Sequence, residues 1–179
     1  MKLLIERDEC ASSPSEWGDD NLFIVANHRQ FYVPVPGEKR IAEDAEELVK
    51  RFKRTHWAFL VEAYIHGGVV LAMAGERDFP DRRWDVSLVG YVFAAKKEWR
   101  MSKTARKAAR GLIETWNQYL SGDVWMYIIK DDEDECIDSC GGFYGEKECR
   151  EEGEKLFKEL SEQPRPEKVD PNQLVLGLS

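Results

Sequence analysis

The stretch GDVWMYIIKDDEDECIDSCGGFYG, residues 122–145, limits the fold more than any other part of the chain. Its first half, 124–130, is an apolar run of strand length, and five consecutive acidic residues follow at 131–135. Residues 135–140 fit a returning strand, and three glycines near the end of the stretch free the backbone to turn into a helix over 146–160. The stretch therefore predicts an antiparallel hairpin followed by a helix.

The rest of the chain alternates short apolar strands with amphipathic helices. Strands are predicted at 2–6, 22–26, 57–65, 69–74 and 86–94, and helices at 41–54 and, in two pieces that break near residue 101, at 96–120. Tight glycine turns between strands favour antiparallel pairing. We therefore expect an α+β fold, a two-layer sandwich with a mainly antiparallel sheet of about six or seven strands and about three or four helices.

Length and hydrophobic content bound the domain organisation. The chain has 179 residues, of which 42% are hydrophobic, enough for a well-packed core. A single α+β domain is predicted over 1–162, with a C-terminal tail over 163–179 whose apolar patch at 174–176 suits docking as an edge strand or binding a partner. The apolar window 57–74 contains charged and glycine residues, so it predicts a hairpin and no membrane span.

The charge balance is acidic, with 26 lysines and arginines against 34 aspartates and glutamates and a net charge of −8. Such a charge opposes non-specific binding to nucleic acid and suits a basic partner or mimicry of DNA. The first residues, MKLLIERDEC, have only a short apolar run before charged residues, which does not fit a signal peptide. With four cysteines and no secretion signal, we expect reduced thiols and a cytoplasmic location.

Four short motifs carry a resemblance to a known family. They are S-P-x-E-W at 13–17 before N-L at 21–22, W-D at 84–85 before V-G-Y at 89–91, Y-L-x-G-D-V at 119–124 and D-S-C-x-G-F-Y-G at 138–145. In these motifs the chain resembles a family of uncharacterised proteins encoded by bacteriophages and related mobile elements, over most of residues 1–155. It departs from the family pattern in having three residues between Trp17 and Asn21, where the family has one. The resemblance implies an accessory protein that binds host proteins or blunts defence inside the host cell, and it implies no activity.

Cys140 is the candidate for chemistry. It stands beside two glycines and ahead of a helix, and His28 or His66 would serve as its base in a hydrolase or transferase. The alternative is a buried cysteine that closes a strand. A zinc site does not fit, because Cys136 and Cys140 on one strand would lie about 13 Å apart and no paired C-x2-C occurs. No cofactor or metal is expected, since the chain contains no motif for one.

Two polar groups of residues have a structural explanation beside a functional one. The acidic run at 131–135 offers oxygen ligands for a divalent cation, but its spacing fits no EF-hand, and a solvated turn is favoured. Asp138 is expected to cap backbone N–H groups in the glycine turn. Glu62, Tyr64 and His66 share one face of a strand, and we expect that face to be the wet side of an antiparallel sheet rather than acid–base machinery.

Binding is expected from aromatic loops and from a basic helix face. Trp17 and Trp84 lie in polar loops, where tryptophan suits an interface. Between residues 96 and 110, seven side chains are basic and only Glu98 is acidic. Four of the seven share a helix face that suits phosphates, an acidic partner or solvent, namely Lys103, Arg106, Lys107 and Arg110.

The leading hypothesis is a non-enzymatic phage or mobile-element protein that binds a host protein, in one version as a defence inhibitor with a DNA-like acidic surface. Two alternatives stay open. One is an enzyme that uses Cys140 with a histidine, and the other is nucleic-acid binding through the basic helix at 96–110.

Overall fold

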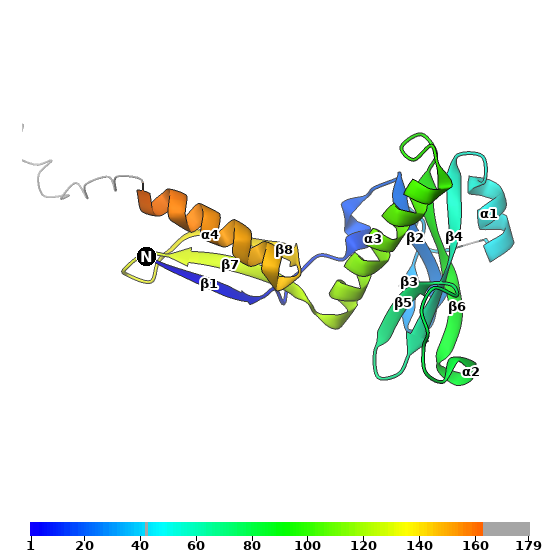
Figure 1. Ribbon diagram of the computed structural model, residues 1–179, viewed down its shortest axis with the longest axis horizontal. Helices are drawn as coiled ribbons and strands as arrows, with labels where there is room; N and C mark the ends of the chain where they lie inside the picture. Colours follow the sequence, from blue (N-terminus) through cyan, green and yellow to red (C-terminus); the bar gives the residue numbers. More distant parts are fainter. Residues whose placement is uncertain (42, 163–179) are drawn as a thin grey trace, which may run out of the picture.

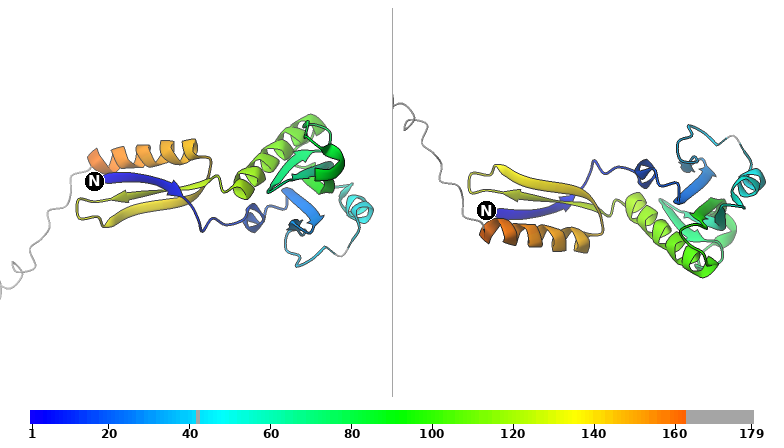
Figure 2. Two further views of the ribbon diagram at one scale, coloured as in Figure 1. Left: turned by 90° about the horizontal axis from the view of Figure 1, so that it is seen from below. Right: turned by 90° about the horizontal axis from the view of Figure 1, so that it is seen from above.

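The computed structural model describes residues 1–41 and 43–162, which form two lobes lying end to end (Figure 1, Figure 2). Each lobe has its own antiparallel sheet with a helix packed on it. The predicted α+β fold is confirmed, and its strands are divided between two sheets rather than joined in one. Within the described ranges, no helix is both long enough and apolar enough to cross a membrane. The apolar patch at 174–176 lies outside the described residues.

The large lobe, residues 13–41 and 43–121, is built on a five-stranded sheet in the order β3-β2-β6-β4-β5, and every neighbouring pair is antiparallel. The strands of this sheet are β2 (Leu22–His28), β3 (Phe31–Val33), β4 (His56–Ile65), β5 (Val69–Met73) and β6 (Val86–Ala95). A short helix, α2 (Arg82–Asp85), directly precedes β6. The sequence does not predict β3, because Pro34 stands directly behind it and Pro36 follows soon after.

Helices cover both faces of this sheet. α3 (Ser102–Ser121) lies on one face, and its buried side chains recur at three- and four-residue steps, namely Ala105, Ala109, Ile113 and Trp116. Ile24 of β2 belongs to the core beneath α3. Because successive residues of a strand point to opposite faces, its neighbour Phe23 lies on the other face of the sheet. On that second face the short α1 (Ala45–Phe52) buries Leu48 against Phe23 and Phe93. The larger core lies beneath α3.

The helix boundaries follow local capping signals. α1 is shorter than the predicted 41–54, because Asp44 caps its first turn and accepts a hydrogen bond from the Glu47 N–H at 2.9 Å. α3 lacks the predicted first piece, since 96–101 is a turn. It ends at Gly122, whose φ of +70° favours glycine.

The small lobe, residues 1–12 and 122–162, brings together the two ends of the described chain. Its sheet has the order β1-β7-β8, formed by β1 (Lys2–Arg7), β7 (Val124–Lys130) and β8 (Cys136–Tyr144). The predicted helix is α4 (Glu146–Glu162), which packs on one face of the sheet and buries Cys149 against Tyr127. It lies so close that a Cβ added at Gly153 would be 3.0 Å from the Cβ of Tyr127.

Two segments join the lobes, and three of the four motifs of the resemblance lie beside them. The first segment leads from β1 into the 3₁₀ helix η1 (Pro14–Trp17). Trp17 packs edge-on against Tyr144 of β8, with ring centroids 5.2 Å apart. The Tyr144 hydroxyl donates a hydrogen bond to the Ser12 carbonyl at 3.2 Å. The ring contact between Trp17 and Tyr144, which belong to two of the motifs, therefore joins the two lobes.

The second segment leads from the end of α3 into β7. Arg7 donates a hydrogen bond to the Gly122 carbonyl and stacks over the Trp125 ring, 4.4 Å from its centre. Asp8 accepts a hydrogen bond at 2.8 Å from the Gly142 N–H of β8. The motif at 119–124 thus contains the end of α3 and the turn after it. Arg7 at the end of β1 is bound to the carbonyl of Gly122 in that turn.

Candidate functional site

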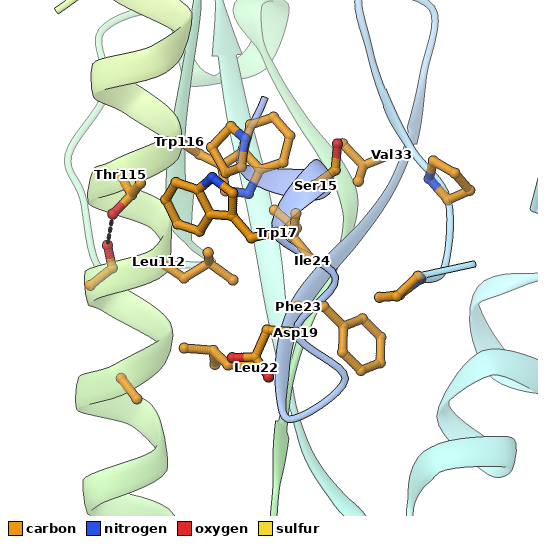
Figure 3. Close-up of a pocket in the computed structure, with 15 residues that line it drawn as sticks. Ser15, Trp17, Asp19, Leu22, Phe23, Ile24, Val33, Leu112, Thr115 and Trp116 are labelled. Carbon is orange, nitrogen blue, oxygen red and sulfur yellow. Dashed lines mark hydrogen bonds between the residues drawn. The ribbon is translucent and has the colours of Figure 1, made fainter. Parts of the chain in front are cut away.

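An apolar pocket of about 330 Å³ lies beside α3 in the large lobe (Figure 3). Its walls come from four parts of the chain: η1 with the loop behind it, β2, the proline segment at 33–36 and one flank of α3. Trp17 lies at the pocket beside Leu112 and Trp116 of α3, and Ile24 of β2 is beneath it. The predicted binding residue Trp17 therefore lines a concave site.

Local capping fixes the segment that carries Trp17. The Ser13 hydroxyl accepts a hydrogen bond from the Ser15 N–H at 3.3 Å, and the Glu16 carboxylate accepts one from the Ser13 N–H at 3.3 Å. Gly18 ends the turn with a φ of +64°, a conformation that costs glycine little. These contacts hold η1 in one position, so the tryptophan is presented on a fixed base.

The two tryptophans of the pocket have different surroundings. Trp17 is 53% exposed, although one edge of its ring contacts the small lobe. Trp116 is 4% exposed and packs edge-on against Phe31, with ring centroids 5.3 Å apart. Trp116 belongs to the core and forms the floor, whereas half of Trp17 remains available to a partner.

The polar side chains of the pocket are engaged in local hydrogen bonds. Asp19 accepts one from the Asn21 N–H at 2.7 Å, and the Thr115 hydroxyl donates one to the Gly111 carbonyl at 3.2 Å. Asp19 is the one ionisable side chain among the described residues that line the pocket. The pocket therefore offers apolar shape, without the paired titratable groups that acid–base catalysis needs.

The predicted basic face of α3 is divided by Glu76, which lies in the loop after β5. Glu76 Oε1 is 2.6 Å from the Arg106 guanidinium, and Oε2 is 2.7 Å from that of Arg110. The hydrogen bond from Arg110, supported by that from Arg106, holds the pKa of Glu76 below its ordinary value. Lys103 and Lys107 have no carboxylate partner within the described part of the chain.

Trp84 lies on a separate surface. It belongs to α2 and does not line the pocket at Trp17. Its side chain is 79% exposed, and the Arg83 guanidinium lies 5.3 Å from the ring centre. The structure therefore does not bring together the two tryptophans that the sequence predicts as binding residues.

Glu62 corrects the prediction of a wet strand face. Its side chain is buried, and Arg82 reaches it with both guanidinium nitrogens, at 2.5 and 3.2 Å. A carboxylate removed from water requires such a partner. On the same face, His66 Nδ1 lies 3.2 Å from a carboxylate oxygen of Asp85. Both contacts fix the loop that carries α2, so the prediction of a solvated face is wrong for Glu62.

The structure does not bring Cys140 to a histidine. Cys140 lies on β8 in the small lobe, whereas His28 ends β2 and His66 follows β4 in the large lobe. No hydrogen bond or ion pair joins Cys140 to a histidine within residues 1–41 and 43–162. Cys140 is exposed, so it is not the buried strand cysteine of the alternative. The buried thiol is Cys149, and burial raises its pKa.

The acidic run between β7 and β8 is tied to its own turn and to β1. Asp131 accepts hydrogen bonds from the N–H groups of Glu133 and Glu135, at 2.8 and 3.0 Å. Lys2 lies 2.5 Å from Asp134 and lowers the pKa of that carboxyl. Among the described residues, no three histidine, cysteine or acidic side chains are grouped to hold a metal ion.

Asp138 has a different partner from the one predicted. It accepts a hydrogen bond from the Tyr127 hydroxyl at 3.4 Å on the face that α4 covers. The N–H of Gly142 is capped by Asp8, a residue more than a hundred positions earlier in the chain. The prediction of a glycine turn is wrong at Gly141 and Gly142, because β8 runs through both. The N–H of Gly142 is therefore bound by Asp8 and not by Asp138.

The sequence does not predict the pocket, because its four walls are distant in sequence. One local signal is present on α3. The small residues Ala108 and Gly111 lie on the flank beside Leu112, where they leave room between the helix and the η1 loop. Comparison of the chain with protein-family models, with curated proteins and with solved structures found no match.

Proposed function

We propose that this chain is a non-enzymatic binding protein of phage or mobile-element origin, and that it binds a host protein through the pocket between η1 and α3. The observation that carries the proposal is the half-exposed Trp17 beside an apolar pocket. Tryptophans in such positions dominate the binding energy of many protein interfaces. The resemblance to phage-encoded proteins supports the host setting.

The expected occupant is one large apolar side chain of the partner, with acidic residues beside it. A volume of about 330 Å³ is near the lower end of the range for ligand pockets, about 300–1,000 Å³, and so suits a side chain better than a cofactor. Lys107 precedes Gly111 by one helical turn, so it flanks the pocket on the surface of α3. Its ammonium group, which has no carboxylate partner among the described residues, favours an acidic neighbour on the partner.

Binding is favoured over thiol chemistry by the position of Cys140. A cysteine nucleophile needs a base within hydrogen-bonding reach, and no described histidine makes a hydrogen bond with this one. The pocket contains neither a cysteine nor a histidine among its described residues. The apolar pocket therefore supports the binding hypothesis more directly.

The first step of the test is to trap the partner. Benzoylphenylalanine is introduced at Ser15, which lines the pocket, and the protein is irradiated in a lysate of bacterial host cells. The same crosslinker at Glu159, an exposed position on α4, is the control. We expect a stoichiometric adduct from position 15 and none from position 159.

The second step tests whether the purified partner uses the pocket. Ala108→Leu fills the pocket, whereas Glu114→Leu adds the same side chain to an exposed position of the same helix. We expect Ala108→Leu to raise the Kd at least about tenfold and Glu114→Leu to change it less than about twofold. An unchanged Kd for Ala108→Leu, in a variant that melts like the wild type, would show that the pocket is not the binding site.

A further inference from the structure

One end of the large lobe gathers segments that are distant in sequence (Figure 1). His56 at the start of β4 pairs with Ala95 at the end of β6, and Leu22 at the start of β2 pairs with Ala94. α1 ends shortly before β4 begins, and the turn at 96–101 leads from β6 into α3. The last turn of α1, the 96–101 turn and the first turns of α3 therefore lie at the same end of the sheet.

These segments carry exposed cations that no carboxylate of the described residues neutralises. Six exposed cations in and beside these segments have no carboxylate partner among the described residues: Lys53, Arg54, Lys97, Arg100, Lys103 and Lys107. Lys96 is held inward, because its ammonium group donates to the Lys53 carbonyl at 2.5 Å and lies 4.9 Å from the centre of the Trp57 ring. Of the described carboxylates, Asp20 lines the hollow at this end and Glu98 lies in the 96–101 turn. We name this surface of six cations the basic end.

Cations from the segment after α1 and from the 96–101 turn line a common hollow. Arg54 and Lys97 both line an open hollow of about 490 Å³ at the end of the sheet. His56 is fixed in its wall, since its Nε2 donates to the Asp20 carbonyl at 3.1 Å. Two cations from separate elements thus face the same space, which is large enough for a phosphate group.

The start of α3 adds to the positive potential of the basic end. Met101 at the N-cap offers no side-chain acceptor, and the first turn contains no acidic residue. The first N–H groups of this 20-residue helix therefore remain available to an external acceptor. Phosphate oxygens suit such positions, because the helix dipole and the N–H groups both favour an anion.

The acidic balance of the whole chain does not prevent an anion from approaching. The acidic run at 131–135 and the glutamate-rich α4 belong to the small lobe, at the other end of the molecule (Figure 1). Exposed charges are largely screened beyond about 8 Å at physiological salt. The local charge of the basic end therefore decides what binds there.

We infer that the basic end binds the phosphate backbone of nucleic acid. Its cations extend from the end of α1 across the 96–101 turn to the second turn of α3, so several of them can meet successive phosphates at once. Arg106 and Arg110, which the sequence includes in the basic face, are withdrawn by Glu76 and do not belong to the site. The hollow lined by Arg54 and Lys97 shares no lining residue with the pocket at Trp17, and Lys107 is the one cation of the basic end that we also place beside that pocket. The tests below therefore use Lys97, Arg100 and Lys103, which the proposed pocket does not use.

The direct test is fluorescence anisotropy of labelled single- and double-stranded DNA of about 20 nucleotides, titrated with the whole protein. We expect binding at about 50 mM salt, and a loss of affinity of about a hundredfold or more by about 200 mM. Lys97→Ala removes one cation and should reduce the slope of log K against log salt by about 1. No binding of either DNA at about 50 mM salt would overturn the inference.

Charge reversal locates the site. The double variant Arg100→Glu, Lys103→Glu should weaken DNA binding at least about tenfold. The control is the double variant Lys147→Glu, Lys158→Glu on α4, which makes the same change in net charge. It should weaken DNA binding less than about threefold. All four side chains are exposed, and circular dichroism confirms that each variant folds. Equal losses in the two pairs would overturn the assignment, because binding would then follow net charge alone.

Two competitors separate the classes of ligand. Polyglutamate should displace the labelled DNA much less effectively than unlabelled DNA of the same charge. Equal displacement would mean that the surface accepts an acidic protein, and it would overturn the inference. Ala108→Leu, which fills the pocket, should leave DNA binding unchanged. Failure of one proposal is thereby distinguished from failure of the other.

Discussion

Glu76 is a single carboxylate that forms ion pairs with two arginines of α3. Its contribution to the free energy of unfolding can be measured by varying the pH. Folding lowers the pKa of Glu76 below its ordinary value of 4.5. The carboxylate therefore stabilises the fold fully at pH values above its pKa in the unfolded chain. The contribution is lost as pH falls through the lower pKa of the folded state. Glu76→Gln should therefore reduce the free energy of unfolding by about 0.5–1 kcal/mol at pH 7, with the difference shrinking below about pH 4.

Urea denaturation at pH 7 and at pH 3 measures this difference. Glu114→Gln is the matched control, since Glu114 is exposed on α3 and makes no ion pair with a described residue. It should be neutral at both pH values. An equal loss for Glu76→Gln at both pH values would mean that the side chain acts through packing and not through its charge.

Single residues also show where the sequence stops being informative. Helical spacing places Arg106 and Arg110 on one face, but nothing local indicates that Glu76, thirty or more positions earlier, meets them. Glu62 is similar, because alternation along a strand predicts its face but not the loop that brings Arg82 over it. Exposure of a charge depends on what covers it, and the covering segment is set by tertiary structure.

At the scale of elements, α3 and α4 each contain an internal glycine, with opposite surroundings. A Cβ added at Gly111 meets nothing within 4 Å, whereas one at Gly153 lies 3.0 Å from the Tyr127 Cβ and 3.2 Å from a methyl carbon of Leu3. Gly111→Ala should raise the free energy of unfolding by about 0.5–1 kcal/mol through helix propensity. Gly153→Ala should lower it by about 1 kcal/mol, because crowding outweighs the same gain.

Chemical denaturation of the two variants side by side makes the comparison. Gly111→Ala serves as the reference, since it makes the same substitution in a helix that has room for the methyl group. If Gly153→Ala stabilised the protein as much as Gly111→Ala, α4 would not pack on β7 as closely as described.

Long patterned elements are the part of the fold that the sequence predicts well. Strand β7, helix α4 and the central strands follow periodic apolar residues, whereas β8 continues through Gly141 and Gly142, where the sequence predicts a turn. The short η1, β3 and α2 are not predicted, because caps and tertiary contacts fix them more than periodicity does. Nor does any local pattern reveal that β1 pairs with β7. That pairing sets the small lobe apart and places three of the four motifs at the junction. The pocket depends on the same long-range arrangement.

At the scale of the molecule, the lobes differ in the size of their cores. In the described ranges, the core cluster of the small lobe has three buried side chains, whereas the cluster beneath α3 has sixteen. We therefore expect the small lobe to open alone, at a free energy at least about 1 kcal/mol below that of global unfolding. Cys149 reports this opening, because its thiol is buried and its pKa is raised by burial.

The measurement is the rate at which a thiol reagent modifies Cys149 at increasing urea concentrations. Cys10, Cys136 and Cys140 are exposed and are replaced by serine, so that one thiol reports. Global unfolding is followed in parallel by circular dichroism. If both probes gave the same free energy, residues 1–162 would open as one cooperative unit, and the lobes would not be independent in stability.

The small lobe is interrupted by the large one, since β1 comes from the start of the chain and its partner strand from residues 124–130. On the ribosome, the large lobe has its complete sheet and covering helix once residue 121 has emerged, whereas β1 still lacks a partner. At usual elongation rates the apolar strand KLLIER waits on the order of ten seconds for β7. The speed of translation thus sets how long a nascent chain exposes that strand to chaperones and to neighbouring chains.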